Sequence, residues 1–499
     1  MRRGPGWLQR LRWLIEPGES LGRRATNAGA WAFALNMTNR LSTIIRSIIL
    51  ARLLSPEDFG LMGIALLVIG LVTSFTQVGF TSALVQSKRG LDRRFLDTAW
   101  TVEVARSLAL GAAMALSAPM VGEFFDSPGA VGLTRLLAAG LALGGLVNTG
   151  VVSFDKDLEF QRRFVFRSVP HVVDLVVSVI LAIILGNAWA LAFGWVAGRV
   201  GMVVASYVAH PHRPRFFFDK GAARSMWSFG VWTLASHILL YFTLNLDDIV
   251  VGRVIDAAAL GLYTMAFTVS QLTTTEITSV VNQVAFPAYS RLQDAPTRLA
   301  RAYTRTVQLV ALASFPVAAG LWFVGPTAVE VILGRQWLAM VPAFSVLVLW
   351  GLIRSLLATT GPLFRGIGRP SIATEIQGAQ LVILAMLIYP LTAGFGIVGA
   401  AWATVLAAIG PDAVALVLAA RAATASLGAV GRVILFPAAH SLLMLLVLVA
   451  LDRYTALPSG GWFLVWAPTI GVITYVAGVL MSRARLGYLA GGILPGEAS

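Results

Sequence analysis

The chain has 499 residues, of which 57% are hydrophobic and 12% are charged, and its mean hydropathy is +0.78. A soluble domain of this length cannot bury so much apolar surface, so the composition excludes an ordinary soluble protein and indicates a chain that crosses a membrane several times. Cysteine is absent, which excludes disulfides, thiolate metal sites and cysteine nucleophiles. The net charge of +14 would suggest nucleic-acid binding in a soluble protein, but in a membrane protein it must first be compared with the topology.

The chain begins with a basic, amphipathic stretch over residues 1–24. Trp7, Leu11 and Ile15 fall on one helical face beside arginines, which is typical of a short helix lying on a membrane surface. The stretch lacks a long apolar run and a small-residue cleavage site, so we do not expect a signal peptide. Residues 154–168 have a similar composition, and a basic loop that orients the neighbouring helices is an equally good explanation for both stretches.

Membrane-spanning helices follow along the rest of the chain, each needing roughly 20 mostly apolar residues. Fourteen stretches meet this requirement. Their approximate bounds are 27–50, 60–85, 97–118, 131–152, 169–185, 190–209, 227–249, 260–286, 304–324, 339–362, 371–390, 396–419, 432–451 and 461–481.

Basic residues lie mostly in alternate connections between these helices. With the N-terminus placed inside, the inner segments hold 28 of the 38 Lys and Arg residues, whereas the outer connections hold only Arg52, Arg253, Arg335 and Arg453. The positive-inside rule therefore supports fourteen helices with both termini inside. The positive charge follows from this orientation, and we expect no nucleic-acid partner.

Two stretches separated by 201 residues share a pattern: ARLLSPEDFGLMGIALLVIG at 51–70 and GRVIDAAALGLYTMAFTVSQ at 252–271. This offset also aligns identical residues, among them Trp31 with Trp232 and Gly60 with Gly261. Six predicted helices separate the copies, an even number, so both copies cross the membrane in the same direction. Parallel repeats of this kind in transporters are related by an axis along the membrane normal, with the substrate between the halves.

The repeat predicts an all-α polytopic membrane protein with two parallel-repeat six-helix bundles and two further C-terminal helices. A cytoplasmic amphipathic segment over 1–24 precedes the bundles. The N-terminal bundle is predicted over 25–212, the C-terminal bundle over 213–425, and the last two helices with the tail over 426–499.

Four short motifs occur in order along this duplicated chain: ARLLSPEDFGLMG at 51–63, VGFTSALVQ at 78–86, DLEFQRR at 157–163 and GIGRPSI at 366–372. Together they resemble the polysaccharide-biosynthesis flippases, the Wzx-type oligosaccharide exporters of the multidrug/oligosaccharidyl-lipid/polysaccharide exporter superfamily. The resemblance implies a protein that moves a lipid-linked oligosaccharide, of the undecaprenyl-pyrophosphate type, from the cytoplasmic to the periplasmic leaflet by alternating access. The exported glycan would supply an exopolysaccharide or an O-antigen.

The resemblance also implies a bacterial inner-membrane location, with both termini cytoplasmic. The expected partners are the lipid-linked oligosaccharide, membrane lipids, and a polysaccharide polymerase with its co-polymerase. We expect no cofactor and no metal site, and transport driven by a proton or sodium gradient. The family has no invariant catalytic motif that could be carried over to residues of this chain.

Charged and polar residues within the predicted helices supply candidate sites, because a charge at bilayer depth is expensive and usually faces a cavity or a partner. Arg40, Arg46, Arg199 and Arg354 are predicted to bind the anionic substrate. Helix 27–50 carries a polar stripe within a sector of about 120°. Besides Arg40 and Arg46 it comprises Asn36, Asn39, Thr43 and Ser47. A polar seam between packed helices is the alternative explanation for this stripe.

Acidic residues in the second half are candidates for ion coupling. The 201-residue offset aligns Arg46 with Asp247 and Ser47 with Asp248, while His237, Tyr241 and Asp248 share a face that is predicted to line the cavity. Glu276 is an isolated acid near the centre of helix 260–286. Alternatively, the two aspartates pair with arginines such as Arg253 or Arg46, and Glu276 is a neutral, hydrogen-bonded acid.

No HExxH, P-loop or GxSxG motif and no acidic cluster occurs, so we predict no catalytic residues and a protein that is not an enzyme. A cation-coupled multidrug antiporter of the same superfamily is one alternative, although its cavity should carry acids and aromatic residues. A membrane glycan ligase or polymerase is another, although a large outer loop with catalytic residues would then be expected. No predicted outer loop is that long.

Overall fold

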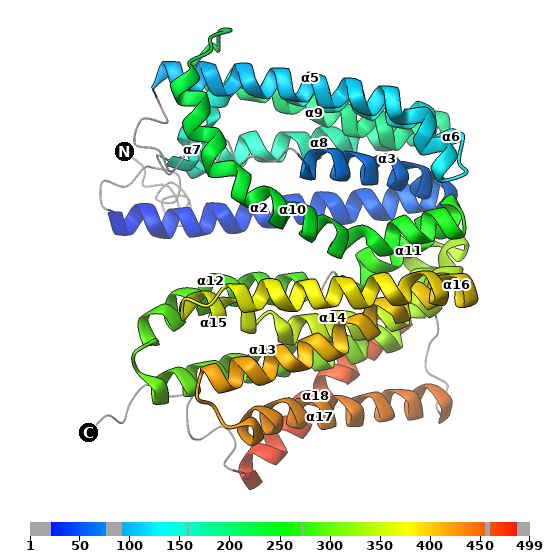
Figure 1. Ribbon diagram of the computed structural model, residues 1–499. Coiled ribbons are helices and arrows are strands. Elements are labelled where there is room, and N and C mark those ends of the chain that lie inside the picture. Colours follow the sequence, from blue (N-terminus) through cyan, green and yellow to red (C-terminus); the bar gives the residue numbers. More distant parts are fainter. Residues whose placement is uncertain (1–20, 76–91, 157–158, 272–273, 455–459, 487–499) are drawn as a thin grey trace, which may run out of the picture. The chain divides into compact units, whose positions relative to one another are not determined.

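The computed structural model describes residues 21–75, 92–156, 159–271, 274–454 and 460–486 (Figure 1). The helices of the first half are α2 (Leu21–Leu53), α3 (Pro56–Ser74), α5 (Arg93–Phe124), α6 (Gly129–Gly144), α7 (Val152–Lys156), α8 (Phe160–Leu185), α9 (Trp189–Ala209) and α10 (Lys220–Val254). Those that follow are α11 (Ala257–Gln271), α12 (Thr274–Leu292), α13 (Pro296–Ala328), α14 (Val341–Leu357), α15 (Thr360–Gly366), α16 (Ser371–Ala422), α17 (Leu427–Tyr454) and α18 (Phe463–Leu486).

This part of the chain contains helices and no strands, and nine helical stretches in it are long and apolar enough to cross a membrane. The predicted all-α membrane fold is confirmed. The two predicted helices 371–390 and 396–419 are both present within α16, separated by a kink at which Gly396 leaves the helical conformation with φ 62° and ψ −145°. Glycine adopts this left-handed region without the steric penalty of a side chain, which explains why the interruption falls there.

Four other predicted helices differ from the observed ones. The stretch 131–152 is a helix only to Gly144, where α6 ends, and a 3-10 turn over Thr149–Val151 then leads into α7. Helix 339–362 is interrupted after Leu357, where α14 ends, and α15 begins at Thr360 after two intervening residues. The stretch 260–286 falls on two elements, α11 and α12. Helix 169–185 begins nine residues earlier than predicted, at Phe160 of α8, so part of the basic stretch 154–168 belongs to a spanning helix. Basic residues in that stretch indicated a membrane surface, but helices extend through such residues when their side chains can reach water or a polar cavity.

The first repeated break is a tight helix-to-helix turn. Ser55 is the N-cap of α3, where its Oγ accepts from Asp58 N at 3.2 Å and its main-chain N donates to Asp58 Oδ2 at 2.9 Å. Pro56 occupies the first helical position, where a missing N–H leaves no helix bond unmade. Asp58 Oδ1 also accepts from Ala188 N at 2.8 Å, just before α9 begins. The turn is thereby fastened to the start of a second helix.

The second repeated break is capped in a related way and packs against the first. Asp256 Oδ1 accepts from Ala259 N at 2.7 Å at the start of α11. A Cβ on Gly60 would lie 1.6 Å from Ala257 O, and one on Gly261 would lie 1.8 Å from Pro56 O. Since the offset of 201 relates Pro56 to Ala257 and Gly60 to Gly261, each contact is the repeat-related image of the other.

Contacts divide the chain into two compact units: unit 1 comprises residues 1–245 with 256–261, and unit 2 comprises 246–255 with 262–499. In unit 1, α8 packs against α2 and α9, and α6 packs against α5 and α9. In unit 2, α13 packs against α14, α17 and α18, and α14 packs against α16. The domain boundaries at residues 212 and 425 stay a prediction.

Replacing Gly60 with Ala should destabilise the protein, because the methyl group would overlap the carbonyl of Ala257. Overpacking of this kind typically costs about 1–3 kcal/mol of unfolding free energy. Thermal unfolding of the purified protein in detergent measures the effect. Gly410→Ala is the matched control, since no neighbouring atom lies within 4 Å of a Cβ at that position. Equal unfolding temperatures for the two variants would contradict the close helix contact.

Candidate functional site

Unit 1 contains a polar cavity of about 640 Å³. Side chains from α2, α5, α8 and α9 and from the segment between α6 and α8 form its walls. The ionisable residues on these walls are Glu103, Arg163, Arg167, His171, Asp174 and Arg199. The ionisable lining is thus mainly basic, within a bundle of membrane-spanning helices.

Glycines on α9 set the spacing of the cavity wall. A Cβ on Gly194 would lie 1.8 Å from Ser178 Oγ of α8, and one on Gly198 would lie 2.8 Å from Pro170 O. Small residues four positions apart allow membrane helices to approach closely. This approach brings the polar side of α8, including Asp174, directly against α9.

Asp174 joins α8 to α2 through an ion pair. Arg46 Nε lies 3.2 Å from Asp174 Oδ1, and the two side chains are 21% and 19% exposed. Ser178 Oγ donates to the same carboxylate oxygen at 2.8 Å and accepts from Arg46 Nη2 at 3.4 Å. Arg46 therefore has an acidic partner on a distant helix, and the polar stripe of α2 is partly a helix seam.

Arg199 lines the cavity from α9. Its guanidinium lies 4.6 Å from the centroid of the Trp195 ring, one turn earlier on the same helix. A cation above an aromatic face is stabilised by the negative face of the ring, while the edge of the guanidinium keeps its donors available. Stacking on Trp195 thus orients Arg199 without neutralising its charge.

A basic stripe on α8 was missed by the sequence analysis. Arg163, Arg167 and His171 all line the cavity and are spaced four residues apart, so they lie on one face of the helix about 6 Å apart along its axis. Asp174 and Ser178 continue the same stripe at helical spacing. This periodicity was the available signal, but it was hidden because the predicted helix began at residue 169.

The connection after α9 is hydrogen-bonded to the cavity wall. Asn148, which lines the cavity, donates from Nδ2 to His212 O at 2.7 Å. His212 Nε2 lies 3.2 Å from Asp97 Oδ1 of α5. Burial lowers the pKa of His212 from its usual value, and the nearby Asp97 carboxylate opposes this shift.

Unit 2 has a buried polar cluster around Asp247 of α10. Asp247 is 3% exposed, and Tyr263 of α11 donates its hydroxyl to Asp247 Oδ2 at 2.7 Å. The Tyr263 hydroxyl also lies 3.2 Å from Thr404 Oγ1 of α16. Three helices thus meet at one carboxylate, with Asp248 half-buried beside it.

A second polar cluster of unit 2 surrounds Asp412 of α16. Asp412 is 3% exposed and accepts a hydrogen bond from Gln380 Nε2 in the earlier part of the same element. Asp412 also attracts Arg354 of α14 electrostatically, and the Arg354 guanidinium lies 5.2 Å from the centroid of the Trp350 ring. Arg354 therefore lies over an aromatic face, as Arg199 does over Trp195, and the Asp412 carboxylate is near enough to act on its charge.

The family model for polysaccharide biosynthesis proteins matches residues 49–342, which is more than half of the chain. The chain belongs to this family. Lipopolysaccharide biosynthesis protein WzxC of Escherichia coli (strain K12) is 22% identical to it over 364 residues, which cover 72% of this chain and 73% of the relative. Succinoglycan biosynthesis transport protein ExoT of Rhizobium meliloti (strain 1021) is 26% identical over 329 residues, 65% of each chain.

A solved structure of this fold is the lipid II flippase MurJ in an inward closed conformation. The two structures superpose with a TM-score of 0.77 at 15% sequence identity, and the match covers 92% of this chain and 99% of the MurJ chain. The match shows that this polysaccharide biosynthesis protein has the MurJ fold over nearly its whole length. The family resemblance predicted from the sequence is thereby confirmed.

The predicted polar residues of α2 have different surroundings in this polysaccharide biosynthesis protein. Asn39 lines the cavity, and its main-chain carbonyl accepts from Thr43 Oγ1 at 2.9 Å. Arg40 and Ser47 are half-buried. The side chain of Asn36 lies outside the described residues. The cavity roles of these residues stay predictions.

The remaining predicted residues belong to α10 and α12. Tyr241 is buried and donates its hydroxyl to Leu67 O of α3 at 2.8 Å, so this polar group already has a partner. His237 is half-buried. The side chain of Glu276 lies outside the described residues. Their roles in a cavity or in ion coupling stay predictions, as do those of Asp247 and Asp248.

Replacing Asp174 with Asn should destabilise the protein, because Arg46 would keep its charge at a largely buried position without its acidic partner. Breaking a fully buried pair costs about 3–5 kcal/mol, and at this partial exposure we expect roughly 1–3 kcal/mol. Thermal unfolding tests this, and the double variant Arg46→Gln/Asp174→Asn should recover most of the loss. A double variant as unstable as Asp174→Asn would contradict the pairing.

Proposed function

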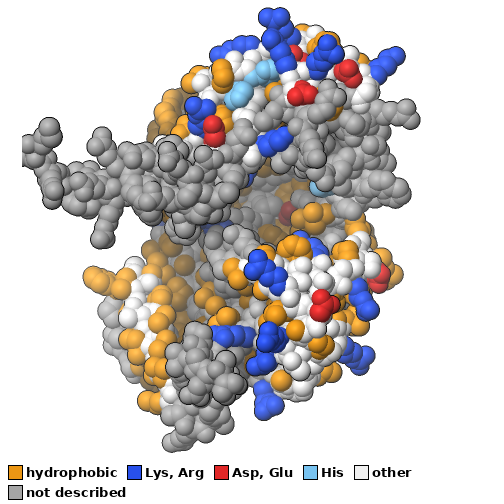
Figure 2. All heavy atoms as spheres, turned by 90° about the vertical axis from the view of Figure 1, so that its left-hand side faces the viewer, with side chains coloured by type: hydrophobic (Ala, Val, Ile, Leu, Met, Phe, Trp, Pro, Cys, Tyr) orange, Lys and Arg blue, Asp and Glu red, His pale blue; other side chains and the backbone are white. Residues whose placement is uncertain are grey.

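We propose that this protein is a flippase that moves a lipid-linked oligosaccharide, of the undecaprenyl-pyrophosphate type, from the cytoplasmic to the periplasmic leaflet of a bacterial inner membrane. Membership of the polysaccharide biosynthesis family and the MurJ fold support transport, and relatives are named for lipopolysaccharide biosynthesis and succinoglycan transport. Both termini are proposed to be cytoplasmic. Lys and Arg side chains gather on the face of unit 1 at which α5 and α8 begin, which supports this orientation (Figure 2).

The observation that carries the proposal is the basic cavity of unit 1. Three arginines line this cavity: Arg163 and Arg167 near the start of α8, and Arg199 in the middle of α9, where a charged side chain is expensive at membrane depth. An anionic ligand that leaves water would offset that cost. Arginine stays charged at any cellular pH, and its planar fork can donate two parallel hydrogen bonds to phosphate oxygens. A pyrophosphate group matches these donors.

Arg199 is the best placed of the predicted substrate ligands, because Trp195 holds it on the cavity wall without cancelling its charge. Arg40 and Arg46 of α2 are proposed to assist in unit 1. Arg354, which lies over the Trp350 ring, is proposed as a basic group of unit 2 that binds the substrate in another step of alternating access. The basic lining favours this substrate over the cationic drugs of a multidrug antiporter.

Ion coupling is proposed for Asp247, with Asp248 and Glu276 as further candidates. Asp247 is a buried carboxylate shared by α10, α11 and α16, so binding of a proton or a sodium ion would change how these helices are joined. A gradient of either ion could then drive the change of access. A polymerase and its co-polymerase are proposed to receive the exported glycan.

Replacing Arg199 with Ala should weaken binding of a lipid-pyrophosphate analogue roughly 10- to 100-fold, because a hydrogen bond to a charged group contributes about 1.5–3 kcal/mol. Arg199→Lys should have a smaller effect, since the charge remains and only the fork is lost. Binding to the purified protein and polymer export in cells measure both variants. Arg135→Ala is the matched control, an exposed arginine of α6 in the same unit.

Normal binding and export by Arg199→Ala, at a membrane level equal to wild type, would reject the cavity as the pyrophosphate site. If Arg199 only joined helices, the variant would instead lower the amount of folded protein. The Lys and Ala variants would then fail together in folding, whereas a ligand role leaves both proteins folded.

Asp247→Asn should abolish the dependence of transport on a proton or sodium gradient. The amide preserves the shape and can still accept from Tyr263, but it neither titrates nor carries the charge that binds a cation. Transport into proteoliposomes with imposed gradients measures the effect. Asp452→Asn, at an exposed position of α17, is the control. A gradient response equal to wild type in Asp247→Asn would remove Asp247 from the coupling site.

A further inference from the structure

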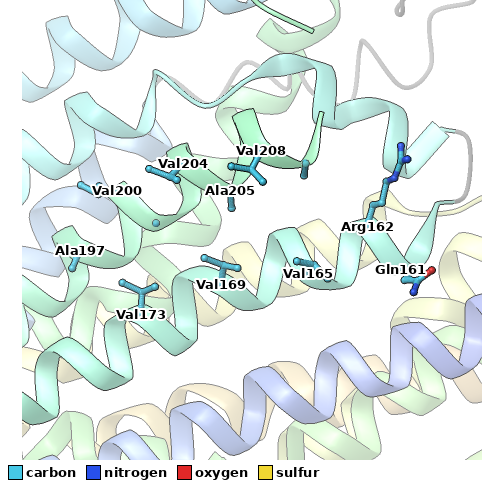
Figure 3. A pocket seen from close by; sticks show the side chains of 12 residues that line it. Gln161, Arg162, Val165, Val169, Val173, Ala197, Val200, Val204, Ala205 and Val208 are labelled. Atoms are coloured by element: carbon cyan, nitrogen blue, oxygen red, sulfur yellow. The ribbon is translucent and has the colours of Figure 1, made fainter. Parts of the chain in front are cut away.

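An apolar groove of about 1100 Å³ runs between α8 and α9 (Figure 3). Valines from both helices form its walls, and Gln161 and Arg162 lie at one end. Val165 is 53% exposed, Val204 is 56% exposed and Val208 is 83% exposed, so these walls are open to the surroundings. The basic cavity uses other residues of α8, so this helix has a polar side toward the cavity and an apolar side toward the groove.

The groove has the length of one membrane leaflet. Its lining on α8 extends from Gln161, the first residue of the apolar span 161–185, to Val173 at the middle of that span. On α9 it extends from Ala209 at the end of the helix to Ala197, which corresponds to about 18 Å of helix. Half of a hydrocarbon core is about 15 Å. The groove therefore matches one lipid chain whose head lies at the basic end of α8.

At the polar end of the groove, the lining residue Arg162 forms an ion pair with Glu159, which lies just outside the lining. Arg162 Nη1 lies 3.1 Å from Glu159 Oε2, one turn earlier, and the two side chains are 59% and 42% exposed. An apolar chain gains little by leaving other lipid chains for this groove, so selectivity must come from the head group. A head group with both a phosphate and an ammonium complements Arg162 and Glu159 together, whereas a purely anionic head group offers no partner for the carboxylate.

We propose that this groove binds a zwitterionic aminophospholipid, with its phosphate at Arg162, its ammonium at Glu159 and one acyl chain along the valines. Val169 and Val204 contact the chain from opposite walls. The bound lipid fills the outer side of α8, the helix whose inner side carries the basic stripe of the cavity. The inference is independent of the transported substrate.

Native mass spectrometry of the full-length protein, with added phosphatidylethanolamine or phosphatidylglycerol, tests this proposal. Wild type should retain phosphatidylethanolamine in roughly two- to fivefold preference, the range expected for an exposed ion pair. Glu159→Gln leaves Arg162 alone and should reverse the preference toward phosphatidylglycerol. Because Glu159 is exposed, this variant should fold normally.

A second variant tests the groove itself. Val169→Trp/Val204→Trp fills the apolar walls and should remove the preferential lipid binding. Val472→Trp/Val476→Trp is the matched control, since these α18 valines are 62% and 45% exposed and should tolerate the same change without effect. Three results would overturn the proposal: no preference in wild type, a preference of wild type for phosphatidylglycerol, or preferential binding that survives filling of the groove.

Discussion

Arginine keeps its charge inside a membrane, so each buried arginine needs a compensating group. The packing of this protein depends on whether that group is an acid or an aromatic ring. Arg46 forms an ion pair with Asp174 of a neighbouring helix, and Arg106 forms one with Glu103 of its own helix. Arg199 rests on an indole ring, a weaker compensation that leaves its full charge. Arginines that pair with acids therefore join helices or turns to one another, whereas the Trp195 ring leaves Arg199 available to an anion.

Glycine determines where these polar contacts can form. Gly194 and Gly198 remove side chains from α9 at the level where Asp174 and Ser178 project from α8, so the seam and the cavity wall share one close helix approach. A larger residue at either position would separate the helices and displace the carboxylate that pairs with Arg46. The polar site thus depends on residues that carry no chemistry of their own.

Much of the fold could be predicted from the sequence, because apolar runs, basic connections and the 201-residue repeat are local or periodic signals. The pairing of Glu103 with Arg106 was predictable for the same reason, since the two lie one turn apart. The partners of Arg46 and Arg354 were not predictable, because Asp174 and Asp412 are brought to them only by packing of distant helices. The basic stripe of α8 escaped prediction because arginines at the start of a spanning helix resemble those of a membrane-surface loop.

The contact between the two repeated breaks is its own image under the 201-residue offset: Gly60 faces Ala257 as Gly261 faces Pro56. Such reciprocity is the defining property of an isologous interface between identical subunits. A chain of half the length, with one glycine at this position, could form both contacts at once as a twofold dimer. Joining two such copies end to end would preserve the crossing without any new complementary residue, provided that each half keeps its glycine.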